Sequence, residues 1–244
     1  MALSLGVVGC GVIGPKHLDH LAGYAPVRLR ALADLRGDRL RDAAAKYSPD
    51  LTYSSGAALI DDPEVEAVIL ALPAEPRHEL ALAALRAGKH VLLEKPVARS
   101  VEEVDAYLEL VRPGQVVACA SARFRFLPSY AALRDALDSP GLRPIRQIVH
   151  EGTRPNPARP ATPPPDWRLS FRLNGGGIMS NWGCYDLDWL LSLLQPDDQP
   201  TEVAASWRGV PAAIESWVAA GSAAEPEIMR RILRNPSVQN SRVA

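Results

Sequence analysis

The residues from Gly9 to Gly14 form a GxGxxG pattern between an apolar run and a segment that begins with Pro15. In this setting the first glycine allows a tight turn, the second lets the backbone approach an anion, and the third lets helix and strand pack closely. The free N–H groups and the positive dipole end of the following helix then face that anion. The pattern predicts that the pyrophosphate of a nicotinamide dinucleotide binds at Gly9, Gly11, Val12, Ile13 and Gly14. A glycine-rich turn without a ligand is the alternative.

Asp34 ends the second apolar run, twenty residues after Gly14. A carboxylate at this position accepts hydrogen bonds from both ribose hydroxyls of the adenosine half of the cofactor, which favours NAD. Arg36 follows two positions later, and a guanidinium there would pair with the 2′-phosphate of NADP. NAD is therefore the expected cofactor and NADP the alternative. For Asp34 itself, a role as helix N-cap or turn residue is also open.

A second reactive group stands at the end of another apolar run, where His90-Val91-Leu92-Leu93 is followed by Glu94-Lys95-Pro96. The carboxyl ends of parallel strands line the ligand crevice, and a residue before proline is held extended, so Lys95 should project there. A lysine transfers protons when burial and a neighbouring cation, such as an oxidised nicotinamide ring, lower its pKa from about 10.4 toward neutrality. Glu94 would bind the nicotinamide ribose or orient the lysine. An ordinary surface lysine is the alternative.

The elements that position these residues follow from the hydrophobic pattern of the first half. The predicted strands are Leu3–Val8, Val27–Ala33, Val65–Leu72, His90–Leu93 and Val116–Ala120, and the predicted helices are Pro15–Tyr24, Gly37–Tyr47, Arg77–Ala87 and Ser100–Val111. Their alternation implies right-handed crossovers, so the predicted fold class is α/β with a Rossmann-type doubly wound parallel sheet. The rhythm changes near residue 121. This predicts a dinucleotide-binding domain at residues 1–120 and a smaller, shortened α+β domain at 121–244.

The second half is less regular. Its predicted elements are a helix at Pro128–Asp138, a turn at Ser139–Gly141, a strand at Ile145–Glu151, a helix from Gly175-Gly176-Gly177 to about Leu194, a strand at Glu202–Arg208, and helix and polar tail after Pro211. Six of the eleven residues from Pro155 to Pro165 are proline, which favours a stiff extended loop. A docking site for a proline-reading domain is the alternative for this loop.

Charge and cysteine usage exclude several classes of protein. The formal net charge of the 244 residues is −1 and the charges are scattered, which argues against nucleic acid or an anionic membrane as partner. Cys10, Cys119 and Cys184 are far apart and lack a CxxC spacing, so neither a disulfide framework nor a metal site is predicted. The run from Leu3 to Cys10 lacks a preceding basic residue and is too short for a signal peptide, and no run approaches the roughly 18 apolar residues of a membrane span. We expect a soluble cytoplasmic protein.

The order of these motifs resembles that of the Gfo/Idh/MocA oxidoreductases. The resemblance rests on the glycine pattern, Asp34, the segment Ala84–Pro96, Arg125-Phe126-Leu127-Pro128, Trp167-Arg168 and Gly175-Gly176-Gly177, which together span residues 3 to about 208. The stretch AGKHVxxEKP is the most specific part. The resemblance implies hydride transfer between a nicotinamide and a sugar, cyclitol or related hydroxyl carbon. It places Lys95 in the catalytic-lysine position, Leu72 and Pro73 along the cofactor, and Trp167 and Arg168 near the nicotinamide or substrate.

The chain departs from the family pattern after the triple glycine. Many members carry an aspartate and, four residues later, a histidine; here these positions hold Asn181 and Tyr185. One helical turn places both side chains on one face. Tyrosine donates and accepts protons, so Tyr185 would share the hydroxyl proton with Lys95, while Asn181 and Arg168 would hold the substrate. Packing within the core is the alternative for Asn181 and Tyr185, and Asp186 and Asp188 are further candidates for polar contacts.

A second departure is length, since members usually run about a hundred residues longer and end in a broad antiparallel sheet. A natural short form, a truncation and a shifted reading frame are the explanations that this leaves open. An incomplete sheet leaves an unpaired edge, which invites pairing with another chain, as in a homo-oligomer, or loss of stability. The leading hypothesis is an NAD(P)-dependent dehydrogenase or ketoreductase acting on a polyol or sugar-like substrate. The competing hypotheses are a catalytically silent NAD(P)-binding sensor or assembly protein, and a non-redox member that retains NAD.

Overall fold

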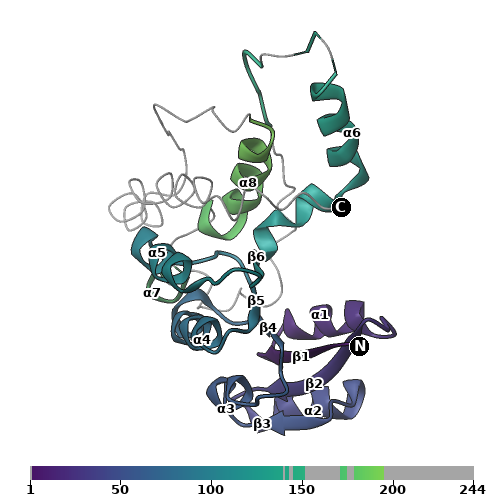
Figure 1. Cartoon of the computed structure of the whole chain (residues 1–244), viewed down its shortest axis with the longest axis vertical. Coiled ribbons are helices and arrows are strands. Elements are labelled where there is room, and N and C mark those ends of the chain that lie inside the picture. The colour runs from purple at the N-terminus through teal and green to yellow at the C-terminus, as the bar shows by residue number, and fades with distance from the viewer. Residues whose placement is uncertain (1, 140, 143–144, 152–170, 175–178, 195–244) are drawn as a thin grey trace, which may run out of the picture. The chain divides into compact units, whose positions relative to one another are not determined.

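The chain divides into two compact units, Met1–Ala120 and Ser121–Ala244 (Figure 1). The computed structural model describes residues 2–139, 141–142, 145–151, 171–174 and 179–194. The parts of the second unit that carry the predicted proline-rich loop, Trp167, Arg168, the triple glycine, the strand at Glu202–Arg208 and the segment after Pro211 lie outside these residues.

The first unit is built on six parallel strands in the order β3-β2-β1-β4-β5-β6. The strands are β1 Leu3–Val8, β2 Val27–Ala33, β3 Leu51–Tyr53, β4 Ala67–Leu70, β5 His90–Leu93 and β6 Val117–Cys119. The order reverses at β1, so the chain runs outward in one direction through β2 and β3 and in the other through β4, β5 and β6. This is the strand order of a Rossmann sheet, and the predicted fold class is confirmed for this unit.

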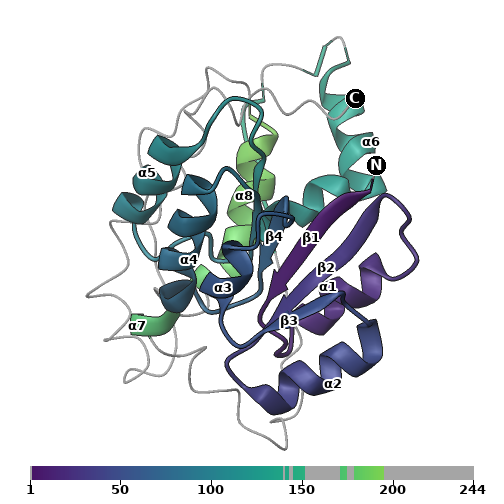
Figure 2. The same ribbon diagram turned by 60° about the horizontal axis from the view of Figure 1, so that its bottom comes forward.

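Helices cover both faces of the sheet (Figure 2). They are α1 Gly14–Leu21, α2 Gly37–Tyr47, α3 Gly56–Ile60, α4 Ala74–Arg86 and α5 Val101–Leu110. On one face, Leu18 of α1 and Ala43 of α2 pack with Val7 and Leu32 of the sheet. On the other face, a Cβ added at Gly6 of β1 would lie 2.5 Å from a side-chain carbon of Leu59 in α3, so this glycine lets α3 pack directly on the central strand.

The structure matches the predicted β1, β2, α2 and β5 at both ends. Helix α4 begins at Ala74, three residues before the predicted start at Arg77. Pro76 does not prevent this, because the first N–H groups of a helix have no intrahelical partner to lose. The sequence analysis missed β3 and α3, which are three and five residues long. Such short elements are too brief to display a hydrophobic period.

The regular secondary structure in the described part of the second unit is all helical. It contains a 3₁₀ segment at Ala120–Phe126, α6 at Pro128–Leu137, α7 at Phe171–Asn174, a π-helical turn at Met179–Gly183 and α8 at Cys184–Ser192. The predicted strand at Ile145–Glu151 is wrong: this segment forms no ladder with any described residue. Its apolar residues fit a strand, but a strand exists only where a neighbour pairs with its backbone. The predicted continuous helix to Leu194 is also corrected, because the helix changes from π to α geometry at Cys184.

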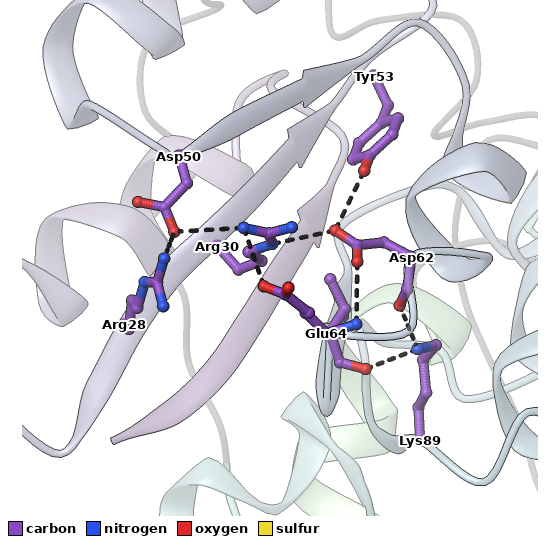
Figure 3. Close-up of polar contacts among 8 residues, drawn as sticks. Arg28, Arg30, Asp50, Tyr53, Asp62, Glu64 and Lys89 are labelled. Carbon is purple, nitrogen blue, oxygen red and sulfur yellow. Dashed lines mark hydrogen bonds and ion pairs between the residues drawn. The ribbon is translucent and has the colours of Figure 1, made fainter. Parts of the chain in front are cut away.

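A polar network surrounds Asp62 and Lys89, which precede β4 and β5 at the amino edge of the sheet (Figure 3). The Asp62 carboxylate, which is buried, accepts hydrogen bonds from Arg30 Nε and Tyr53 Oη, each at 3.1 Å, and from the Glu64 N–H at 2.9 Å. Lys89 Nζ donates to the carbonyls of Asp62 at 2.9 Å and Val65 at 2.6 Å. These contacts join β2, β3 and the segments that lead into β4 and β5. Their position at the amino edge favours a structural role, since ligands of such sheets bind at the carboxyl edge.

Candidate cofactor and catalytic site

The residues that the sequence analysis singled out in the first unit follow the carboxyl ends of four neighbouring strands. The glycine pattern follows β1, Asp34 follows β2, Leu72 and Pro73 follow β4, and Glu94-Lys95-Pro96 follows β5. Backbone hydrogen bonds hold these strand ends together: the Gly9 N–H donates to Ala33 at 2.8 Å, and the Ala71 N–H donates to Val8 at 2.8 Å. The fold therefore brings the four motifs to one edge of the sheet.

The three glycines of the loop are required for different reasons. Gly9 has a φ of +101°, and a Cβ there would lie 2.5 Å from the carbonyl oxygen of Ala71. A Cβ at Gly14 would overlap the carbonyl oxygen of Gly9. A Cβ at Gly11 would meet only Nη1 of the Arg39 side chain, at 3.3 Å. Gly9 and Gly14 are thus needed for the fold of the loop, whereas Gly11 keeps the outer side of the backbone accessible.

The start of α1 fits an anion. Ile13 is the N-cap residue, and no side chain caps the helix by a hydrogen bond. Pro15 has no N–H and the Lys16 N–H donates to the Ile13 carbonyl at 3.0 Å, so the N–H groups of the loop, at the positive dipole end of the helix, are those that would face a ligand. Val12, 63% exposed, leaves the loop open above them. This cradle fits the pyrophosphate of a dinucleotide.

Asp34 is attached to the glycine loop. Its Oδ2 accepts a hydrogen bond of 2.7 Å from the Cys10 N–H, and its Oδ1 accepts one of 2.8 Å from the Arg36 N–H. The second contact makes Asp34 a turn residue, one of the alternatives above, whereas the N-cap of α2 is Arg36. Each carboxylate oxygen has a further lone pair for a ribose hydroxyl. Burial, followed by the Asp34 charge, raises the pKa of Cys10 to about 11, so this thiol adds no negative charge beside the loop.

Arg36 is occupied by another carboxylate. Its Nε lies 3.2 Å from Oδ1 of Asp38, and its Nη2 contacts the other oxygen of the same group. A side-chain hydrogen bond from Arg36 lowers the pKa of Asp38 to about 2, so the carboxylate stays ionised at neutral pH. The guanidinium that sequence analysis offered to a 2′-phosphate therefore has an anionic partner of its own, which favours NAD over NADP.

Glu94 is buried, with 8% of its surface exposed, and both of its oxygens have partners. Oε1 lies 2.7 Å from His17 Nε2, and Oε2 accepts a hydrogen bond of 3.1 Å from the backbone N–H of Lys95. Burial raises the pKa of Glu94, but the hydrogen bond and charge of His17 and the contacts with Lys95 outweigh it, and the net pKa is lowered. Glu94 is thus an ionised carboxylate that fixes the backbone at Lys95, whose side chain is half-buried.

Two residues of this edge were missed by the sequence analysis. His17 lies in the first turns of α1, three positions after Gly14, and contacts Glu94. Arg77 of α4 is wholly buried and donates to the carbonyls of Leu72, at 2.8 Å, and Pro96. The only sequence signal for either residue is its position in a helix that follows a strand, because their partners Glu94 and Pro96 are 77 and 19 positions away.

Tyr185 in the second unit is 4% exposed. Its ring centroid lies 5.2 Å from that of Phe124 and 5.8 Å from that of Trp182, and the guanidinium carbon of Arg123 lies 4.2 Å from it. Asn181, in the π-helical turn, is half-buried. The ring of Tyr185 therefore packs within the core, which is the alternative that the sequence left open. The role of its hydroxyl group stays a prediction.

The two aspartates of α8 pair with basic side chains of the second unit, and a role of either in a substrate site stays a prediction. Asp188 pairs with Arg125 through two hydrogen bonds of 2.9 and 2.8 Å, and Asp186 lies 3.3 Å from Nε2 of His150. Burial raises the pKa of Asp188 against the opposing effect of Arg125. Arg125 and Asp188 thus join the 3₁₀ segment to α8 within the second unit.

The described residues contain no group of three His, Cys, Asp or Glu side chains placed to hold a metal ion. In the same residues, no helix combines the length and the apolar character needed to cross a membrane.

The sequence matches two family models. Residues 3–121 match the NAD-binding Rossmann fold of the GFO/IDH/MocA oxidoreductase family, and residues 130–223 match the GFO/IDH/MocA C-terminal domain. Among solved structures, levoglucosan dehydrogenase in complex with NADH and L-sorbose is similar, with a TM-score of 0.66 at 25% identity over 79% of this chain and 53% of that chain.

Curated relatives give the same result. Inositol 2-dehydrogenase 2 of Saccharopolyspora erythraea is 31% identical over 91% of this chain and 68% of its own length. Myo-inositol 2-dehydrogenase of Thermotoga maritima is 30% identical over 76% of this chain and 53% of its own length. The chain thus spans about half to two thirds of the length of these relatives. It belongs to the Gfo/Idh/MocA family of oxidoreductases, and its first unit is the NAD-binding Rossmann domain of that family.

Proposed function

We propose that this protein is an NAD-dependent dehydrogenase or ketoreductase acting on a hydroxyl carbon of a sugar, cyclitol or related polyol. The observation that carries the proposal is the placement of Lys95 at the end of β5, on the sheet edge that also holds the glycine loop and Asp34. The names of the relatives support the substrate class, since they include inositol and levoglucosan dehydrogenases and a 1,5-anhydro-D-fructose reductase.

In the proposed reaction, residues of the first unit bind the cofactor and transfer the hydroxyl proton. Bound NAD supplies the hydride acceptor for alcohol oxidation. The backbone from Gly9 to Gly14 binds the pyrophosphate, and Asp34 binds the adenosine ribose. Lys95 Nζ takes the hydroxyl proton when the alcohol is oxidised and returns it when the ketone is reduced. Glu94 holds the lysine backbone in place, which keeps the reacting groups in a fixed geometry.

The second unit, residues 121–244, is proposed to bind the substrate. Arg168 and Asn181 would hold substrate hydroxyl groups, Trp167 would lie near the nicotinamide, and the hydroxyl group of Tyr185 would share the proton with Lys95. Leu72 and Pro73 would border the cofactor in the first unit. We further propose a cytoplasmic location and a homo-oligomer.

The direct test is NAD reduction, followed at the nicotinamide absorbance, with a panel of inositols, anhydrosugars, aldoses and polyols. We expect turnover with at least one member, and a decrease of about 10²- to 10⁴-fold in the Lys95→Ala variant with NADH binding retained. A folded protein that binds NADH but turns over no member of the panel, in either direction, would contradict the proposal.

One observation favours a second candidate, a catalytically silent NAD-binding sensor or assembly subunit. The aspartate and histidine that many family members carry are Asn181 and Tyr185 here, and the Tyr185 ring is buried. Such a protein would bind NADH with the same affinity whether or not Lys95 is replaced, and neither form would turn over substrate. A mass spectrum of the protein as purified would also reveal a tightly retained nicotinamide dinucleotide, as the non-redox alternative requires.

A further inference from the structure

Arg77 is the most completely buried charged residue in the described part of the chain, with 0% of its surface exposed. It lies on α4 and reaches two loops at the carboxyl edge of the sheet. Its Nη1 donates to the carbonyl of Leu72, after β4, at 2.8 Å, and its Nη2 donates to the carbonyl of Pro96, after β5. A single planar guanidinium thus bridges two neighbouring loops.

Stability does not explain this choice of residue. Removing a guanidinium from water is costly, and buried charges can often be replaced by apolar residues of similar volume without loss of stability. Within the described residues, the Nε of Arg77 is buried without a hydrogen-bond partner, which adds to the cost. Burial also lowers the pKa of Arg77, although a guanidinium stays protonated in proteins. The charges of Glu94 and Glu103 favour the protonated guanidinium, and the two carbonyls that it binds are its direct hydrogen-bond partners.

Both carbonyls belong to segments with assigned tasks in the proposed function, on which this inference rests. Leu72 opens the loop that borders the cofactor, and Pro96 directly follows Lys95. We propose that Arg77 is a positioning residue that fixes the Lys95 loop relative to the cofactor loop. The guanidinium suits this role because its donors have a fixed planar geometry, whereas the donors of an ammonium rotate on a flexible stem and an apolar side chain has no donor. Glu94 and His17 hold the same loop from its other end.

The chain contains a matched control at the opposite edge of the same sheet. Lys89 is also buried, and its Nζ also bridges two loop carbonyls, those of Asp62 and Val65. Lys89 and Arg77 are therefore comparable in their contribution to the fold, since each is a buried cation that joins two loop carbonyls. Only Arg77 contacts the segments that carry the proposed chemistry.

The test compares Arg77→Met, Arg77→Lys and Lys89→Met with the unmodified protein. Thermal unfolding gives the structural effect, NADH fluorescence gives the cofactor affinity, and steady-state kinetics with a substrate found in the panel give kcat and KM. A fourth readout needs no activity: the pH dependence of Lys95 labelling by an amine-reactive reagent, quantified by mass spectrometry.

We expect Arg77→Met and Lys89→Met to lower the unfolding temperature by similar amounts. Only Arg77→Met should lower kcat, by about 10-fold to 100-fold, because a displacement of about 1 Å costs that much, with NADH affinity changed less than about threefold. The labelling midpoint of Lys95 should shift by about half a pH unit or more in Arg77→Met and stay constant in Lys89→Met. Arg77→Lys keeps the positive charge but loses the planar guanidinium. Its kcat and labelling midpoint should therefore lie between those of the unmodified protein and Arg77→Met.

The proposal is overturned if the Arg77 variants match Lys89→Met in every readout, or if neither Arg77 variant folds while Lys89→Met does. Failure of the proposed function is a separate result. If the unmodified protein turns over no substrate, the labelling midpoints still decide whether Arg77 positions Lys95.

Discussion

Nε2 of His17 lies 2.7 Å from Oε1 of Glu94, and this contact joins the helix that follows the glycine loop to the strand end that carries Lys95. The two residues are 77 positions apart in the sequence. One belongs to the helix next to the proposed pyrophosphate loop, and the other adjoins Lys95, which would move a proton. The pair therefore couples the two halves of the candidate site through a half-buried, charge-assisted contact.

His17→Ala should weaken both the fold and the site. Glu94 would remain buried with one partner fewer, so its pKa should rise and the free energy of unfolding at pH 7 should fall by about 1–3 kcal/mol. Because the folded-state pKa of Glu94 is lowered, its contribution is present above the unfolded value of about 4.3 and is lost as pH falls through the folded-state pKa. The difference between the two proteins in urea unfolding should thus shrink below about pH 4. His20→Ala, an exposed change on the same helix, is the control, and equal effects of both changes would refute the role of His17.

Gly11→Ala and Gly14→Ala should separate binding from folding. A Cβ at Gly14 overlaps the Gly9 carbonyl, so this variant should unfold at a much lower temperature. A Cβ at Gly11 meets only the flexible Arg39 side chain, so this variant should stay folded and lose NADH affinity, by about tenfold or more, because the methyl group stands where the pyrophosphate approaches the backbone. Calorimetry and NADH fluorescence measure the two effects. A Gly11→Ala protein with unchanged NADH affinity would place the pyrophosphate elsewhere.

Asp38→Ala should relax the preference for NAD. Without Asp38, the Arg36 guanidinium is available to a 2′-phosphate, and the NADPH affinity should rise relative to that for NADH by about threefold to tenfold. NADH affinity should stay nearly constant, because Asp34 still holds the ribose. Titrations with both cofactors measure the ratio. Asp42→Ala, an exposed change on the same helix, should leave it unaltered, and the same ratio in both variants would argue against the Arg36–Asp38 pair as the cause.

Asp62→Ala should destabilise the first unit and leave cofactor binding intact. The change removes three hydrogen bonds at the amino edge, so the unfolding temperature should fall by several degrees. Burial raises the pKa of Asp62, but the hydrogen bonds from Glu64, Arg30 and Tyr53 prevail and lower it, so its contribution is lost as pH falls below the ordinary range for aspartate. Exposed Asp61→Ala serves as the control. A loss of NADH affinity in the folded Asp62→Ala protein would show that the two edges are not independent.

Sequence patterns predicted the first unit because its buried strands and amphipathic helices have clear periods. The ends of β1, β2, α2 and β5 coincide with turn residues or changes of period, and they were predicted correctly. The strand β3 has three residues and its existence depends on pairing with β2. In the second unit, the segment Ile145–Glu151 has strand-like composition but pairs with no described residue. Pairing partners are a property of the tertiary fold and are not encoded locally.

In the candidate site, too, local patterns predicted some residues, and others depend on tertiary contacts. The glycine loop, Asp34 and Glu94 each stand at the end of a predicted strand, so the sequence predicted their place. His17 and Arg77 were missed because each acts on a residue from a different strand end, and the strand order that brings them together cannot be derived from local pattern. The pairing of Arg36 with Asp38 depends on side-chain rotamers, which the spacing leaves open.

The network around Asp62 and Lys89 has a consequence for how this protein can change. It binds Arg30 of β2 and Tyr53 of β3, and it secures the segments that lead into β4 and β5 at the edge opposite to the glycine loop and Lys95. These contacts hold the strands in place independently of the loops at the carboxyl edge. Substitutions in those loops can alter substrate preference while the sheet keeps its order, so the scaffold has mutational tolerance where new specificities would arise.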